Sequence, residues 1–331
     1  MKRISTICAV TILLSTEAAV GDPRHGLLYD RNLDAWTIIE PPVATCSSVS
    51  DIEGSRLVGE YTLTPSIMGP SHGFVYDMDA DEWTYIDMPN TTETVIRGIE
   101  GNILVGRYTD ATGHHGFYYN MNMDVDDPNA WTTLDSPWAP THTAVQDISG
   151  SNLVGIWYDG STMAGFVYDM TMDPNDPAAW TAVEVPPGWS PVDQTQVFGI
   201  GDSRLVGSYA YNDTYSKGFV YDMTMDPNDP NAWTELHFPG ANHSEVMDVV
   251  YTTEGFQYIG SYSYGRPQDG SSAFVTDGTT WMTYDMPGAA YTSFQGFDCG
   301  RFVGTTNVPE PTTVLLLALG CLAAMKRRRR R

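Results

Sequence analysis

Clustered aspartates in the loops before several tryptophans are the residues of this chain best suited to hold a metal ion. Ca²⁺ is bound by several oxygen ligands, and carboxylates at alternate positions can supply them. None of these loops has the glycine and closing glutamate of an EF-hand, and repeated Asp-Pro-Asn-Asp-Pro segments are typical of successive Asx turns. We therefore expect solvated turns, with calcium as the weaker alternative and no other cofactor. The candidate ligands are Asp77, Asp79, Asp81, Asp124 and Asp126.

Aromatic loop residues offer a second kind of chemistry, because flat rings stack on the apolar faces of sugars. Six of them fall in segments that a ring of repeats would bring to one face, beside Asn and Asp side chains that suit sugar hydroxyls. The alternative interpretation is packing between neighbouring repeats. The six residues are Trp138, Trp189, Tyr211, Tyr215, Tyr264 and Tyr291.

Catalytic signatures are absent from the sequence. No serine lies in a nucleophile elbow, no His-Glu-x-x-His occurs, and no glycine-rich phosphate loop follows a strand. The formal charge is −24, from 17 basic and 41 acidic residues, and eight of the 17 basic residues lie in the terminal segments, which leaves nine in the body. So acidic a surface repels polyanions, which argues against nucleic-acid partners. We expect a protein that is not an enzyme, with scattered catalytic residues as the alternative.

The body is built from repeats. A Val-Gly motif, which is Ile-Gly in one unit, places glycines at 59, 106, 155, 207, 260 and 304, and a second series places tryptophans at 36, 83, 131, 180, 233 and 281. Both recur at intervals of about 44 to 53 residues, in the range of propeller repeats. One unit reads as four short strands, 49–53, 56–62, 73–78 and 83–88, each bounded by turn residues.

Incomplete units at the two ends of the body predict how the repeats close. The body begins with the third and fourth strands of a unit (27–30 and 36–40) and ends with the first and second (293–297 and 301–305). In a ring, the last strands complete the first sheet and remove both bare edges. We therefore predict an all-β, six-bladed β-propeller over residues 22–306. A β-solenoid and two small sandwiches are the alternatives.

Both termini carry features of an exported protein. Lys2 and Arg3 precede an apolar run, and small residues follow, so residues 1–21 are expected to be a signal peptide cleaved after Gly21. Export permits a disulfide between the two cysteines of the body, Cys46 and Cys299, although two free thiols are equally compatible with the sequence.

The C-terminal segment, residues 307–331, has three parts: a Pro-Glu-Pro motif, an apolar stretch expected to form a helix, and a basic end. Basic residues beside an apolar segment stay on the cytoplasmic side, so the body is expected to lie outside the membrane. The motif comprises Val308, Pro309, Glu310 and Pro311. The anchor comprises Lys326, Arg327, Arg328, Arg329, Arg330 and Arg331.

This tail resembles the PEP-CTERM sorting signal, also known as the ice-binding protein C-terminal domain. The resemblance implies processing by an exosortase, usually in bacteria that make extracellular polysaccharide, followed by surface attachment or release. His72-Gly73-Phe74, His115-Gly116-Phe117 and His25-Gly26-Leu27 also resemble HAF-type extracellular repeats. Together these features favour a surface or matrix protein with a binding or adhesion propeller whose partner is polysaccharide. The alternative is a secreted hydrolase or lyase acting on glycans.

Overall fold

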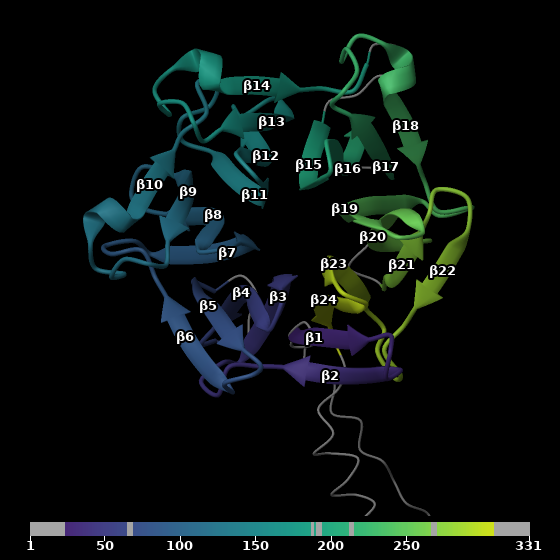
Figure 1. Ribbon diagram of the computed structural model, residues 1–331, viewed down its shortest axis with the longest axis horizontal. Helices are drawn as coiled ribbons and strands as arrows, with labels where there is room; N and C mark the ends of the chain where they lie inside the picture. The colour runs from purple at the N-terminus through teal and green to yellow at the C-terminus, as the bar shows by residue number, and fades with distance from the viewer. Residues whose placement is uncertain are drawn as a thin grey trace, which may run out of the picture.

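The structure is a computed structural model that describes residues 24–64, 69–186, 189, 194–211, 215–265 and 270–307. The signal peptide, the Pro-Glu-Pro motif, the apolar helix and the basic anchor predicted from the sequence lie outside these residues. The described chain is almost entirely β-structure, arranged as groups of four antiparallel strands around a common centre (Figure 1). We call each group a blade. Within the described residues, no helix is both long and apolar enough to cross a bilayer.

The blades are numbered from the first complete unit. Blade 1 comprises β3 (Cys46–Glu53), β4 (Arg56–Thr62), β5 (Ser71–Asp77) and β6 (Glu82–Ile86). Blade 2 comprises β7 (Glu93–Glu100), β8 (Ile103–Thr109), β9 (His114–Asn120) and β10 (Trp131–Leu134). Blade 3 comprises β11 (Thr143–Ser149), β12 (Asn152–Tyr158), β13 (Met163–Asp169) and β14 (Trp180–Val183).

The remaining blades continue in chain order. Blade 4 comprises β15 (Gln194–Gly201), β16 (Arg204–Tyr211), β17 (Tyr215–Asp222) and β18 (Trp233–Leu236). Blade 5 comprises β19 (His243–Thr252), β20 (Gly255–Ser263), β21 (Ser272–Thr276) and β22 (Trp281–Tyr284). Blade 6 combines the two ends of the chain: β23 (Thr292–Asp298), β24 (Arg301–Thr306), β1 (His25–Asp30) and β2 (Ala35–Ile39).

Blade 6 joins segments that are far apart in the sequence. β1 pairs with β24 in antiparallel register from His25↔Thr306 to Asp30↔Arg301. The strand order is β2-β1-β24-β23, with β23 nearest the centre (Figure 1). Each partial unit therefore supplies the edge that the other lacks, as the incomplete units in the sequence predicted.

The Val-Gly motif is explained by the packing between the strands of a blade. The Gly59 position lies so close to the innermost strand that an added Cβ would be 2.0 Å from the Ser48 carbonyl oxygen and 3.0 Å from the Phe74 ring. Gly59 pairs with Phe74 across β4 and β5, and Phe74 is fully buried. The same close approach recurs at Gly106, Gly155, Gly207, Gly260 and Gly304. Glycine is required there because no side chain fits.

The tryptophan series forms the outer layer. In blade 1, Trp83 pairs with Tyr76 across β5 and β6, and their rings stack with centroids 4.3 Å apart. In blades 2, 3 and 4 the indole Nε1 also donates to a carbonyl of the preceding acidic loop, as Trp131 does to Val125 at 2.9 Å. These three loops contain the short 3₁₀ helices η1 (Pro128–Ala130), η2 (Pro177–Ala179) and η3 (Pro230–Ala232).

Buried hydroxyls link each blade to the next. Thr94, at the start of β7, accepts a hydrogen bond from the amide of Met88, which follows the outer strand of blade 1. Thr143 accepts from Ser136, and Ser244 accepts from Phe238, in the same way. These bonds satisfy backbone donors at the points where the recurring prolines end the outer strands.

The two body cysteines do not form a disulfide. Cys46 is buried at the start of β3, whereas Cys299 is exposed in the turn between β23 and β24, and both thiols are free. That turn lies beside Gly54, at the far end of β3, because the Gly54 amide donates to Asp298 at 2.8 Å. Seven residue steps along a strand span about 23 Å, far beyond the reach of a disulfide.

Candidate binding site at the centre of the propeller

Every innermost strand carries a β-bulge that adds one residue on the side of the central cavity. In β3 the pairing with β4 shifts between Val49 and Asp51, so Ser50 is the extra residue. A bulge re-aims a side chain, and such features recur next to functional sites. The extra residues of the six strands are Ser50, Arg97, Gln146, Phe198, Met247 and Gln295.

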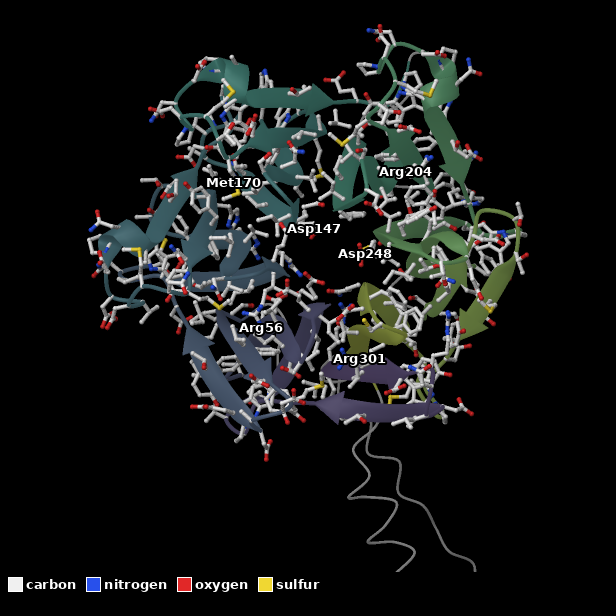
Figure 2. The ribbon with its side chains drawn as sticks, in the orientation of Figure 1. Arg56, Asp147, Met170, Arg204, Asp248 and Arg301 are labelled. Carbon is white, nitrogen blue, oxygen red and sulfur yellow. The ribbon has the colours of Figure 1, made fainter. Side chains whose placement is uncertain are left out.

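All six bulge residues line one cavity of about 60 Å³, which we call the throat. The throat is completed by Asp51, Asp147 and Asp248, which directly follow the bulges of blades 1, 3 and 5. Figure 2 shows Asp147 and Asp248 on the inner strands, toward the centre of the ring. A cavity of this size has room for a few water molecules and not for a sugar ring.

The three throat aspartates connect blades through backbone amides. Asp51 accepts from the amide of Ile52 at 2.7 Å through Oδ1, and from that of Ile99 in blade 2 at 2.9 Å through Oδ2. Asp147 repeats the pattern with Ile148 and Ile200, and Asp248 repeats it with Val249 and Phe297. Each carboxylate thus joins its own blade to the next.

Glycines alternate with these aspartates around the ring. Blades 2, 4 and 6 have Gly98, Gly199 and Gly296 at the equivalent positions. A Cβ on Gly199 would lie 2.9 Å from the Asp248 Cα, and one on Gly296 would lie 2.8 Å from the Asp51 Cα. The neighbouring aspartate strand therefore occupies the space that a side chain would need.

The throat brings three acidic side chains together. Burial raises the pKa of Asp51, Asp147 and Asp248 well above the ordinary value, and repulsion among the three carboxylates adds to the shift. Their bonds to backbone amides act in the opposite direction and are outweighed. Glu53 raises the pKa of Asp51 further, and Glu100 does the same for Asp147.

A larger cavity of about 260 Å³, which we call the mouth pocket, shares Arg97 and Gln295 with the throat. It lies where the inner strands of blades 1 and 2 begin, on the face formed by the blade-to-blade loops. Three of the nine basic residues of the body line it. Its lining residues are Arg24, Cys46, Ser47, Ser48, Glu60, Tyr61, Thr62, Ser71, Glu93, Arg97, Arg107, Gln295 and Thr305.

Ion pairs organise two of the three arginines in the mouth pocket. Arg107 donates to both carboxylate oxygens of Glu93, at 2.8 and 3.1 Å, and Thr109 donates to the same carboxylate at 2.7 Å. Burial raises the pKa of Glu93, but the hydrogen bonds from Arg107 and Thr109 outweigh burial and leave that pKa below its usual range. Arg97 contacts Glu60 at 3.3 Å, and its buried Nε has no hydrogen-bond partner among the described residues.

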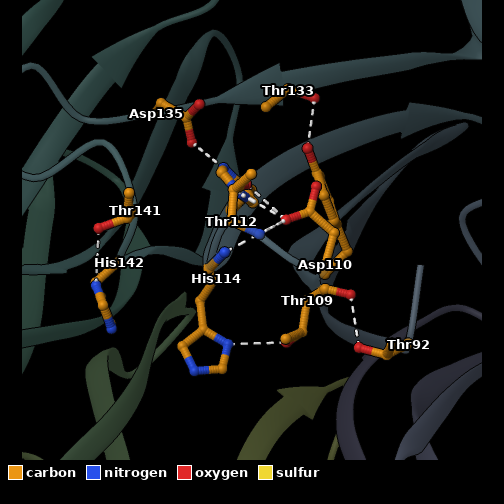
Figure 3. Close-up of polar contacts among 12 residues, drawn as sticks. Thr92, Thr109, Asp110, Thr112, His114, Thr133, Asp135, Thr141 and His142 are labelled. Atoms are coloured by element: carbon orange, nitrogen blue, oxygen red, sulfur yellow. Dashed lines mark hydrogen bonds and ion pairs between the residues drawn. The ribbon is translucent and has the colours of Figure 1, made fainter. Parts of the chain in front are cut away.

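A polar network at the end of blade 2 supports this pair (Figure 3). The Thr109 hydroxyl lies 2.8 Å from His114 Nδ1, and the amide of Thr112 donates to Asp110 at 2.7 Å to close the turn. His115 Nδ1 lies 2.6 Å from Asp135 Oδ1. Because these contacts fix the end of β8 and the start of β9, Arg107 and Glu93 are held at the wall of the pocket.

Arg24 is placed differently from the other two arginines. Its guanidinium lies over the Tyr291 ring, 4.7 Å from the centroid, and it forms no ion pair with the described residues. Glu245, on the inner strand of blade 5, is close enough to Tyr291 to raise the pKa of its hydroxyl by charge repulsion, although burial contributes more to that rise. Burial alone raises the pKa of Glu245, whose side chain has neither hydrogen bond nor ion pair in the described part of the chain.

The six aromatic residues predicted to face sugars do not form one cluster. Trp138, Tyr215 and Tyr264 are exposed, with 39%, 56% and 62% of their surface accessible. Trp189 packs against Tyr209, Tyr291 lies under Arg24, and the side chain of Tyr211 is outside the described residues. No two of the described five form a ring contact with each other. None of the described five lines the mouth pocket, although Tyr291 contacts Arg24, which does.

The aspartates considered as calcium ligands close turns. Asp77 Oδ1 accepts from the amides of Asp79 and Ala80, and Asp124 accepts from the amide of Asp126. Asp81 accepts from the Tyr76 hydroxyl. No three acidic, histidine or cysteine side chains of the described chain converge to ligate a metal ion directly.

Sequence reasoning missed the throat. Its signal lies at a fixed offset in the repeats: Asp51, Gly98, Asp147, Gly199 and Gly296 each stand eight residues before the glycine of their Val-Gly motif. Asp248 stands twelve residues before Gly260, because β19 and β20 form a longer hairpin. Aligning the units on that motif reveals the alternation of Asp and Gly.

Comparison with known proteins identifies the C-terminal tail. Residues 307–331 match the model of the PEP-CTERM protein-sorting motif. This motif indicates an exported protein recognised by exosortase-type machinery and sorted in association with the membrane. No curated protein matches the chain in sequence.

Solved structures resemble the body. TolB from Acinetobacter baumannii matches with a TM-score of 0.51 and 8% identity, over 80% of this chain and 64% of TolB. A prolyl endopeptidase matches with a TM-score of 0.46 and 14% identity, over 80% of this chain and 40% of the endopeptidase. PorZ of the Porphyromonas gingivalis type-IX secretion system matches with a TM-score of 0.40 and 13% identity, over 77% of this chain and 29% of PorZ. The chain spans less than two thirds of each of these proteins. The likeness to TolB supports a β-propeller fold and carries no function.

Proposed function

We propose that this protein is an exported surface or matrix protein that binds polysaccharide without catalysis, through the mouth pocket of a closed six-bladed propeller. The pairing of β1 with β24 supports closure of the ring, because the facing edges of the two terminal half-blades are hydrogen-bonded to each other. The observation that carries the binding function is the gathering of arginines, glutamates and hydroxyls around a cavity of about 260 Å³ in a body with few basic residues.

The chemistry of the mouth pocket suits sugar hydroxyls. Arg107 and Glu93 hold each other in place and retain further donors and acceptors, so they are preorganised for hydroxyls that both give and receive hydrogen bonds. Arg97 and the largely buried Tyr61 complete this part of the wall. Because the acidic body repels polyanions, the ligand we propose is a neutral polysaccharide.

Catalysis on glycans is the second candidate, and the throat aspartates are the observation that favours it. Buried carboxylates with raised pKa values are typical of general acids in glycosidases. Both oxygens of each carboxylate, however, accept backbone amides, and the throat is too small for a sugar ring. Binding therefore accounts for the geometry better than hydrolysis does.

The test is a glycan array probed with the full-length chain in mild detergent, followed by affinity measurement on the retained glycans. Arg97→Gln removes the guanidinium shared by the two cavities and should weaken binding at least tenfold. Arg56→Gln is the matched control, because Arg56 lies at the opposite end of the blade and pairs with Glu53.

Two outcomes would overturn the proposal. Retention of no neutral glycan would remove polysaccharide binding, and unchanged affinity in Arg97→Gln would place the site outside the mouth pocket. Release of shortened products from a bound glycan would instead establish the enzymatic alternative.

A further inference from the structure

The throat contains buried polar groups that the proposed sugar site does not use. Ser50 lines the same cavity as the three aspartates and is only 5% exposed, and its hydroxyl has no hydrogen-bond partner among the described residues. Buried hydroxyls are normally satisfied, so an unpaired one in the wall of a polar cavity indicates a missing partner. The amide side chains of Gln146 and Gln295 add further oxygen atoms to the wall.

Among the described residues, no basic side chain forms an ion pair with the three carboxylates. Arg97, which also lines the throat, contacts Glu60 instead. Buried carboxylates without a counter-charge are costly to ionise, and they are usually paired or bound to a cation. Two lone pairs on each carboxylate oxygen leave acceptor capacity after the amide bonds are made.

We propose that the throat is a binding site for one hydrated Ca²⁺ ion on the central axis. The set of donors consists of carboxylate, hydroxyl and amide oxygens, which hard divalent cations prefer. Within the described ranges, no three acidic side chains converge closely enough to ligate a bare ion, so water molecules bridge the ion to the aspartates. The cavity of about 60 Å³ has room for roughly four water-sized spheres.

The arrangement of the aspartates fits a spherical ligand. They come from alternate blades, so the negative charge is distributed around the axis with approximate three-fold symmetry. An ion at the centre would interact with blades 1, 3 and 5 together. Through the bonds to Ile99, Ile200 and Phe297, it would also engage blades 2, 4 and 6.

The test is calorimetric titration of the full-length, EDTA-treated protein with CaCl₂ at fixed ionic strength, paired with thermal unfolding. We expect one ion per chain and a higher unfolding temperature with Ca²⁺ than with EDTA. Asp147→Asn should weaken Ca²⁺ binding at least tenfold. Ser50→Ala should weaken it severalfold while leaving the metal-free unfolding temperature unchanged, because its hydroxyl has no partner to lose.

Asp124→Asn is the matched control, since it changes one of the loop aspartates first considered for calcium and should leave binding unchanged. Should the wild-type protein bind no Ca²⁺ at millimolar concentration, the proposal is wrong. It is equally wrong if Ser50→Ala binds as tightly as the wild type, or if Asp124→Asn abolishes binding. Tighter binding of Mg²⁺ than of Ca²⁺ would overturn the choice of ion.

Discussion

The throat and the mouth pocket are neighbouring cavities that differ in how the repeated blades supply their residues. In the throat, the same position of alternate blades carries Asp51, Asp147 and Asp248, and each binds backbone amides of two blades. In the mouth pocket, the charged residues come from unrelated positions and satisfy one another, as Arg107 and Glu93 do. Equivalent residues in alternate blades give the throat a symmetric arrangement that suits a spherical ligand. Residues that are not repeated from blade to blade give the mouth pocket an asymmetric wall that can recognise the shape of a ligand.

The comparison predicts that the throat contributes more to stability than any other polar region. Asp147→Ala would leave the buried amides of Ile148 and Ile200 without acceptors. We expect a loss of about 2–4 kcal/mol in the free energy of unfolding, because an unsatisfied buried donor costs about 1–3 kcal/mol. Denaturant unfolding measures it. Asp169→Ala is the control, because this residue ends β13 in the same blade and its carboxylate accepts from the exposed Thr171 amide. An equal loss of unfolding free energy there would show that the throat is not special.

Substitution of a throat glycine tests whether the blades without an aspartate at this position need glycine there. A Cβ at position 199 would lie 2.6 Å from the Met247 carbonyl oxygen, so the backbones of blades 4 and 5 must separate in Gly199→Ala. Overpacking of this kind costs about 1–3 kcal/mol. Gly265→Ala, where a Cβ meets nothing, should cost nothing measurable by the same assay. Equal stability of the two variants would show that blade spacing does not depend on the glycines.

The mouth pocket should show a smaller effect with a defined pH dependence. Because the folded-state pKa of Glu93 is depressed, its stabilisation is present above the unfolded pKa of about 4.3 and disappears as the pH falls through the folded value. Glu93→Gln should therefore lower the free energy of unfolding by about 1–2 kcal/mol at pH 7. The difference from wild type should shrink below about pH 4. A difference that grows on acidification would contradict the assigned role of the carboxylate.

The exposed acidic loops should be the least sensitive region. Asp173→Asn keeps a side-chain oxygen able to accept from the Asn175 amide, so the Asx turn survives. We expect a change within about 0.5 kcal/mol in unfolding free energy, typical of surface substitutions. Parallel melts with Ca²⁺ and with EDTA check that the calcium effect is unaltered. If Asp173→Asn lost the rise in unfolding temperature caused by Ca²⁺, the metal site would have to lie in the acidic loops.

The repeats made much of the fold predictable. The four strands read from residues 49–89 agree with β3 to β6 within a few residues at each end, because turn residues bound each strand. The prediction of an all-β propeller body agrees with the structure, and the pairing of β1 with β24 follows from the half-units. The disulfide considered between Cys46 and Cys299 does not form. The sequence does not show that the two residues lie at opposite ends of neighbouring strands.

The candidate site was less predictable for a physical reason. A bulge changes which face a side chain points to, and the sequence of β3 gives no sign that Ser50 is the extra residue. The mouth pocket joins Arg24, Arg97 and Arg107, which come from blades 6 and 2 and share no motif. Of the six aromatic residues, Tyr211 and Tyr215 lie at strand ends and not in loops, and the described side chains are divided among separate blades without a ring contact between them.

The amino-acid sequence by itself determined the strand repeat, the completing half-units and the export and sorting address, since these depend on local pattern and composition. Only the tertiary structure decided which residues meet at the axis. Carboxylates about one hundred residues apart along the chain come together around one cavity because antiparallel pairing and bulges, both non-local, set their register and direction.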